Sequence, residues 1–294
     1  MTDQDGRPVR VDRWAAFHVN AQGLGQEPFP VAFSLVSAGG LHTIRAAAAS
    51  AAELADVLAA LGQEYAVVLN VGTNSFLDED WAQWPLARIA RAQGVTATAY
   101  DIRWSASRHW SDDLLVLPWT EMDRLFAGWS CHDIEILDAP GPLSPGQADE
   151  VALAVNSHDQ TTAMVPDVPG ATLYFSGHDD CYVHLETTDP TGPVRMLARL
   201  LALKAGVVLL GEDEETEAVT VAEPPRDLLA RLLTGGEHWV GRAARTSPTE
   251  LTVSLAVTGC AWRLADPVPE RLPYRLVLDL PGGTWVALEP GRSD

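Results

Sequence analysis

The segment SGHDDCYVHLETT, residues 176–188, gathers side chains that could do chemistry. Histidine and carboxylate groups act as general acids and bases and as metal ligands. The candidate catalytic residues in this segment are His178, Asp180, His184 and Glu186, and the last two are also weak candidate metal ligands. Adjacent polar residues of the same kinds are typical of a hairpin turn. The segment is therefore either a site or a solvated turn.

The direction of the side chains decides between these two interpretations. In a strand over 181–188, His184 and Glu186 share one face with Tyr182, because successive side chains point to opposite faces. Val183 and Leu185 lie on the other face, which we expect to be the buried one. The polar face becomes a candidate site only if it points inward, because burying a His–Glu pair needs a compensating reason. The alternation favours an exposed polar face.

Other catalytic signatures are absent from the sequence. It has no P-loop, no Rossmann glycine pattern, no nucleophile elbow and no zinc-protease motif. We therefore predict no cofactor, and the sequence does not decide whether the protein is an enzyme. The cysteines at positions 131, 181 and 260 are far apart and form no C-x-x-C pair, which predicts reduced thiols and a cytoplasmic location.

Local patterns predict a mixture of strands and helices. The sequence VAFSLVSAGGLHTIRAAA (31–48) predicts two strands joined at a Gly-Gly turn. Leucine and valine at positions 54, 57, 58 and 61 have the i, i+3, i+4, i+7 spacing of an amphipathic helix. The apolar run YAVVLNVG (65–72) predicts a buried strand. Pro145 and Gln147, after Ser144, predict the start of another helix.

The same order of elements returns about 140 residues later. Residues 171–177, 181–188, 192–206 and 207–211 again predict strand, strand, helix and strand. The motif LDAPG (137–141) has a counterpart in LDLPG (278–282). We therefore predict a tandem duplication, with a first α+β copy over 1–143 and a second over 144–294. Each copy is expected to have a mixed or antiparallel sheet with helices on one side. The alternative is two unrelated α+β halves.

Charge limits the classes of partner. Forty acidic and twenty basic residues give a net charge of −20, which disfavours nucleic acid and anionic membranes as partners. No apolar run reaches the roughly 18 residues that span a bilayer. A basic protein is the predicted partner. The candidate partner-binding residues are two tryptophans in a polar segment and the acidic run near 211–217, namely Trp104, Trp110, Glu212, Asp213, Glu214 and Glu215. The acidic run is also typical of a plain solvated loop.

Two functional hypotheses follow from these observations. The first is an acidic cytoplasmic protein-binding module, of the immunity or inhibitor type, that masks a basic partner. The second is an enzyme with a small-molecule or metal-assisted site in a groove between the two copies. Exposed tryptophans and acidic side chains favour the first hypothesis, and convergent polar groups around His184 favour the second.

Overall fold

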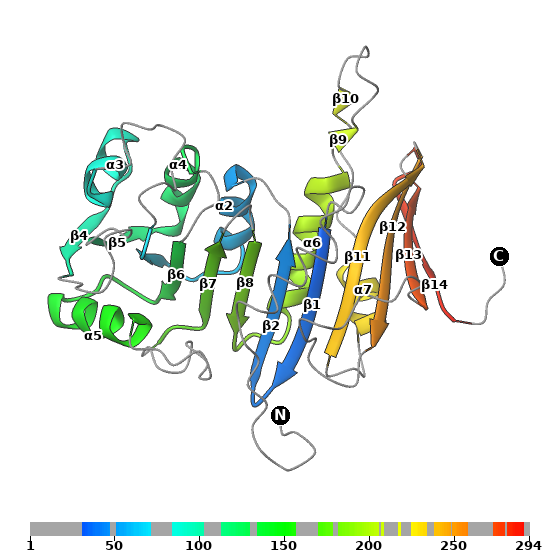
Figure 1. Ribbon diagram of the computed structural model, residues 1–294, viewed down its shortest axis with the longest axis horizontal. Coiled ribbons are helices and arrows are strands. Elements are labelled where there is room, and N and C mark those ends of the chain that lie inside the picture. Colours follow the sequence, from blue (N-terminus) through cyan, green and yellow to red (C-terminus); the bar gives the residue numbers. More distant parts are fainter. Residues whose placement is uncertain are drawn as a thin grey trace. The chain divides into compact units, whose positions relative to one another are not determined.

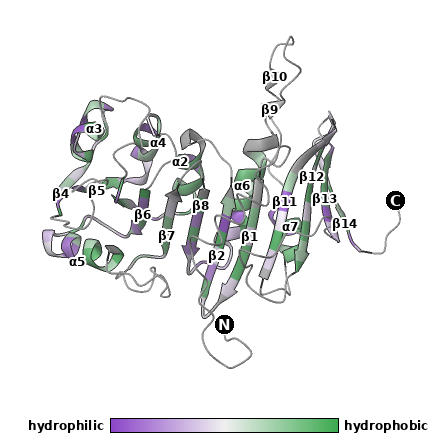
Figure 2. Cartoon of the chain, in the orientation of Figure 1, coloured by the Kyte–Doolittle hydropathy of each residue, from purple (hydrophilic) through white to green (hydrophobic). Residues whose placement is uncertain are grey.

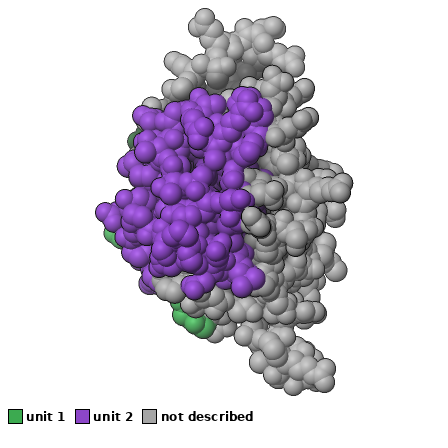
Figure 3. Space-filling model, turned by 90° about the vertical axis from the view of Figure 1, so that its left-hand side faces the viewer, with its two compact units in different colours: residues 1–49, 193–294 green, residues 50–192 purple. Residues whose placement is uncertain are grey.

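A computed structural model shows a chain that mixes helices with antiparallel strands (Figure 1). Its contacts divide the chain into unit 1, residues Met1–Ala49 with Pro193–Asp294, and unit 2, residues Ser50–Gly192 (Figure 3). The structure describes residues 31–47, 51–71, 84–102, 113–129, 134–156, 170–178, 182–205, 207–208, 217–218, 225–233, 238–247, 249–257, 273–279 and 281–290. The predicted α+β class is confirmed, and every strand pairing given below is antiparallel.

Unit 1 is built on a sheet whose strand order is β14-β13-β12-β11-β1-β2. These strands are β1 (Val31–Ala38), β2 (Leu41–Ala47), β11 (His238–Ser247), β12 (Glu250–Val257), β13 (Tyr274–Asp279) and β14 (Thr284–Leu288). Its helices are α6 (Gly192–Ala205, whose first residue belongs to unit 2) and α7 (Arg226–Leu233). Phe33, Trp239 and Val253 are buried on one face of the sheet. Figure 1 draws α6 and α7 behind β1 and β11.

Unit 2 has a sheet with the order β8-β7-β6-β3-β5-β4. These strands are β3 (Tyr65–Leu69), β4 (Thr98–Asp101), β5 (Asp113–Pro118), β6 (Ile134–Ala139), β7 (Leu173–His178) and β8 (Tyr182–Thr187). The helices are α2 (Ala51–Ala59), α3 (Leu86–Ala92), the 3₁₀ turn η2 (Trp119–Glu121), α4 (Met122–Phe126) and α5 (Pro145–Asn156). Hydrophilic and hydrophobic stretches alternate along α3 and α5 (Figure 2), as expected of helices with one face on a core.

Several local predictions are confirmed. The turn between β1 and β2 has positive φ at Gly39 (61°) and Gly40 (83°), the conformation that a two-residue hairpin of type I′ requires. Leu54 and Leu58 of α2 are fully buried, as their helical spacing predicts. At the start of α5, the backbone N–H of Gln147 donates to the Ser144 hydroxyl, and the side-chain oxygen of Gln147 accepts from the backbone N–H of Ser144. This is the reciprocal capping box.

The duplication is not confirmed and stays a prediction. Some elements do recur at the predicted spacing, since β6 (Ile134–Ala139) and β13 (Tyr274–Asp279) are 140 residues apart. The compact units, however, do not follow the predicted copies. The β1–β2 hairpin belongs to the unit that contains β11–β14, and the β7–β8 hairpin belongs to the unit that contains β3–β6. The expected strand at 207–211 is described only as β9 (Val207–Val208), which pairs with β10 (Glu217–Ala218).

Candidate functional site

A strip of polar side chains crosses strands β6, β7 and β8 in unit 2. Glu135 on β6 lies directly opposite Ser176 on β7, and Ser176 lies directly opposite His184 on β8. In the next row of the same face, Tyr174 lies opposite Glu186. Directly opposed residues of antiparallel strands share a face. We call these five residues, Glu135, Tyr174, Ser176, His184 and Glu186, the polar strip.

The centre of the polar strip is a contact between a buried histidine and a carboxylate. The Nε2 atom of His184 lies 3.0 Å from the Oε1 atom of Glu186. The His184 side chain is fully buried, and the Glu186 side chain is 12% exposed. The ring of Tyr174 meets the His184 ring edge-on, with centroids 6.4 Å apart. This contact brings together an imidazole and a carboxylate, two of the groups that most often act as general acids and bases.

The burial of His184 corrects the expectation of an exposed polar face. Val183 and Leu185 are buried as expected, but His184 is buried as well, because β8 is covered on both of its faces. The connection in the β7–β8 hairpin is also one residue longer than the connection in the β1–β2 hairpin. Two residues separate Ala38 from its partner Leu41, whereas three separate His178 from its partner Tyr182. Alternation along one strand therefore did not predict which residues are inside.

The other predicted site residues are not brought together with His184 and Glu186 in the described structure. His178 is the last residue of β7, and nothing is described of its side chain. The remaining candidates lie outside the described residues: Asp180, Trp104, Trp110, Glu212, Asp213, Glu214 and Glu215. Within the part of the chain that the structure describes, no group of three His, Cys, Asp or Glu side chains is placed to hold a metal.

Two tryptophans of unit 2 belong to the core. Trp119 and Trp129 are 4% and 3% exposed. A Cβ atom on Gly62 would overlap the Trp119 indole, and one on Gly177 would lie 2.7 Å from the Trp129 indole. Each glycine therefore leaves the space that an indole fills. For these two tryptophans, packing is the role that the structure describes.

Sequence reasoning missed a buried carboxylate at the end of β6. Asp138 is fully buried, and its Oδ1 atom accepts hydrogen bonds from the backbone N–H groups of Thr172 and Leu173. Its Oδ2 atom accepts from the Thr172 hydroxyl at 2.8 Å. Burial raises the pKa of Asp138 above its ordinary value, although these hydrogen bonds oppose the shift. The LDAPG motif drew attention to this aspartate, but the motif does not predict which distant residues form hydrogen bonds with it.

Charge is divided unequally between the two units. Unit 2 contains 22 acidic and 5 basic residues, a net charge of −17. Unit 1 contains 18 acidic and 15 basic residues, a net charge of −3. Acidic side chains that are exposed in unit 2 include Asp56, Glu64, Asp101, Asp149 and Glu150. The negative field of the protein therefore originates mainly in unit 2.

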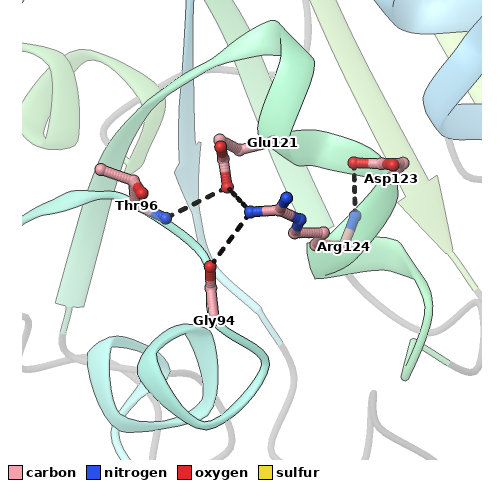
Figure 4. A network of polar contacts seen from close by, with 5 residues as sticks. All are labelled: Gly94, Thr96, Glu121, Asp123 and Arg124. Carbon is pink, nitrogen blue, oxygen red and sulfur yellow. Dashed lines mark hydrogen bonds and ion pairs between the residues drawn. The ribbon is translucent and has the colours of Figure 1, made fainter.

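Two of the five basic side chains of unit 2 make local contacts. The Arg88 guanidinium lies over the Trp84 ring, 3.7 Å from its centroid. Arg124 donates to the Glu121 carboxylate at 3.0 Å and to the Gly94 carbonyl at 3.3 Å (Figure 4). Glu121 also accepts from the backbone N–H of Thr96. This network ties the segment before β4 to η2 and α4.

Comparison with known proteins gives no family model, no curated protein and no solved structure that matches the chain. Among the described residues, no helix is both long enough and apolar enough to cross a bilayer.

Proposed function

We propose that the protein is an acidic binding module whose unit 2 docks a basic protein partner. The observation that supports this most strongly is the net charge of −17 on unit 2 against −3 on unit 1. A field of one sign on one part of a molecule speeds the encounter with a partner of opposite charge and fixes its orientation. An immunity or inhibitor protein in the cytoplasm that masks a basic surface is the role that fits this field.

A general acidic bias is the competing explanation, and the comparison of units argues against it. Selection for solubility alone is expected to give both units a similar net charge. Unit 1 is the longer of the two, yet it carries three times as many basic residues as unit 2, 15 against 5. The large net negative charge of unit 2 alone therefore favours a role for that unit in binding. Attraction to a positively charged partner is a role that this charge can serve by itself.

The proposal is tested by native mass spectrometry of the protein captured gently from its own cells. We expect a stoichiometric basic partner that dissociates as the salt concentration rises. Two neutralised variants localise the contact. The unit 2 variant carries Asp56→Asn, Glu64→Gln, Asp149→Asn and Glu150→Gln, and the unit 1 control carries Asp227→Asn, Glu250→Gln, Asp279→Asn and Glu289→Gln. Equal loss of partner from both variants, or the absence of a basic partner, would contradict the proposal.

The contact between His184 and Glu186 supports a second candidate function, an enzyme with a small-molecule or metal-assisted site. A buried imidazole 3.0 Å from a carboxylate has the composition of a general acid–base pair. Under this candidate function, native mass spectrometry should find a bound small molecule or metal in place of a protein partner. The His184→Gln variant should lose that ligand while keeping its circular dichroism spectrum. Retention of the ligand by His184→Gln would contradict the enzyme hypothesis.

A further inference from the structure

Strand β4 is the terminal strand of the unit 2 sheet. One side of β4 pairs with β5, from Thr98 opposite Val116 to Asp101 opposite Asp113. No strand pairs with its other side among the residues that the structure describes. A terminal strand presents a row of backbone N–H and C=O groups, which is a template for another extended segment. Strand addition of this kind is a common mode of peptide recognition.

The side chains of β4 leave this edge accessible, while the strand itself is anchored. Thr98, Ala99 and Asp101 are exposed and Tyr100 is half-buried, whereas Leu114 and Leu115 of the neighbouring β5 are fully buried. Tyr100 donates its hydroxyl to the backbone carbonyl of Leu143, ahead of α5. Just before the strand, the Thr96 N–H donates to Glu121. An edge held at both ends loses little conformational entropy when a partner binds it.

Two carboxylates meet at this edge. Asp101 on β4 lies directly opposite Asp113 on β5, and like charges at directly opposed positions repel each other. Asp113 has a structural role, because its Oδ2 atom accepts from the Ala87 N–H at the start of α3. Asp101 is exposed. A cation placed opposite Asp101 on an added strand would lie on the same face as both carboxylates and would offset their repulsion.

From these contacts we propose that an extended, arginine- or lysine-bearing segment of the partner adds to β4 as a further strand, with a cation opposite Asp101. This inference rests on the proposed function and deepens it by naming the docking site. The backbone of β4 supplies affinity, and the charge of unit 2 selects a basic segment. In the added strand, alternate residues lie on one face, so cations at every second position all share the face of Asp101.

The test uses the full-length protein and two synthetic peptides that alternate arginine with threonine. The second peptide is methylated at every backbone nitrogen, so that neither of its edges can donate hydrogen bonds to β4 while its charge is unchanged. Binding is measured by calorimetry, and protection of the β4 amides is measured by hydrogen exchange. We expect the plain peptide to bind and to protect residues 98–101, and the methylated peptide to bind at least about tenfold more weakly, a loss of about 1.4 kcal/mol.

Matched charge reversals separate the edge from the general field. Asp101→Arg should weaken the plain peptide about tenfold or more, whereas Asp149→Arg on the exposed side of α5 should weaken it about twofold. Asp101→Asn is a milder variant that keeps the test valid if Asp101→Arg unfolds, and it should weaken binding about threefold. No binding, equal binding of both peptides, or equal effects at positions 101 and 149 would overturn strand addition at β4. None of these results bears on the proposed function itself, which the capture of a basic partner and native mass spectrometry test separately.

Discussion

The two hairpins place different side chains at positions that the predicted duplication makes equivalent. A shift of 140 residues brings Ile44 of β2 in unit 1 onto His184 of β8 in unit 2, and both side chains are fully buried. The same shift brings Ala46 onto Glu186. Unit 1 therefore has an ordinary apolar position where unit 2 has a buried imidazole in contact with a carboxylate. Burying polar groups is unfavourable unless they are paired. Unit 2 therefore differs from unit 1 in having polar side chains at these core positions, and it also differs in net charge.

The first test of this comparison exchanges the side chains at positions 44 and 184. Ile44→His removes apolar burial from unit 1 and leaves an imidazole without a designed carboxylate partner, so we expect a loss of about 3–5 kcal/mol in the free energy of unfolding. Urea denaturation followed by tryptophan fluorescence measures this loss. A loss below about 1 kcal/mol would show that position 44 tolerates a polar group and that the two positions are not distinguished by their surroundings.

The reverse exchange uses a double variant. His184→Ala alone leaves the half-buried Glu186 without the imidazole that it contacts, and we expect it to lower the free energy of unfolding by about 2–3 kcal/mol. His184→Ile combined with Glu186→Ala reproduces the pair in β2, and should fold with a stability within about 1 kcal/mol of the wild type. If the double variant is as unstable as the single one, the polar strip contributes packing that an apolar pair does not replace.

The two L-D-x-P-G motifs provide the second comparison. Asp138 of LDAPG is buried and accepts three hydrogen bonds, whereas Asp279 of LDLPG is exposed and accepts from the Gly282 N–H at 3.1 Å. Asp138→Ala leaves the N–H groups of Thr172 and Leu173 without their acceptor, so we expect a loss of about 3 kcal/mol. Asp279→Ala should lose at most about 0.5 kcal/mol, because water replaces the carboxylate. Similar losses in thermal and urea unfolding would contradict this distinction.

The pH dependence of stability sharpens the same contrast at smaller amplitude. The pKa of Asp138 in the folded protein is raised above 3.8, chiefly by burial, so the folded state binds this proton more tightly than the unfolded state does. The stability that this proton contributes is present below about pH 4 and is lost as the pH rises through the folded pKa. Asp138→Asn cannot titrate. The unfolding free energy of the wild type minus that of Asp138→Asn should therefore fall as the pH rises above about 4, the ordinary pKa of an aspartate. A rise over this range would show that hydrogen bonding, and not burial, dominates.

Much of the secondary structure could be predicted because it depends on short-range patterns. The Gly39-Gly40 turn follows from the need for positive φ, and the start of α5 follows from Ser144 and Gln147, which cap each other. The buried strand β3 follows from an uninterrupted apolar run, and it is buried from Ala66 to Leu69. Each of these features depends on residues within a few positions of one another. Local chemistry was therefore sufficient.

The candidate site depended on contacts between distant residues and could be predicted only in part. His184 and Glu186 were recognised as neighbours on one face, but their burial depends on what covers β8. Asp138 finds its partners 34 residues away, at Thr172. The division of charge was also hidden, because unit 1 joins residues 1–49 to residues 193–294. A count over residues 50–192 reveals it, but the predicted boundary between 143 and 144 divides that segment.

The smallest expected effect concerns the polar network between Glu121 and Arg124. Glu121→Gln keeps an oxygen that can accept from Thr96 but removes the ion pair with Arg124, whose side chain is 55% exposed. Exposed pairs contribute little, so we expect a loss of at most about 0.5 kcal/mol in the free energy of unfolding. Glu121→Ala also removes the acceptor that anchors the segment before β4, and it should increase hydrogen exchange of residues 98–101 while lowering global stability by no more than about 1 kcal/mol. If exchange at β4 is unchanged in Glu121→Ala, the edge strand is held by β5 and Tyr100 alone, and the network is dispensable for the docking edge.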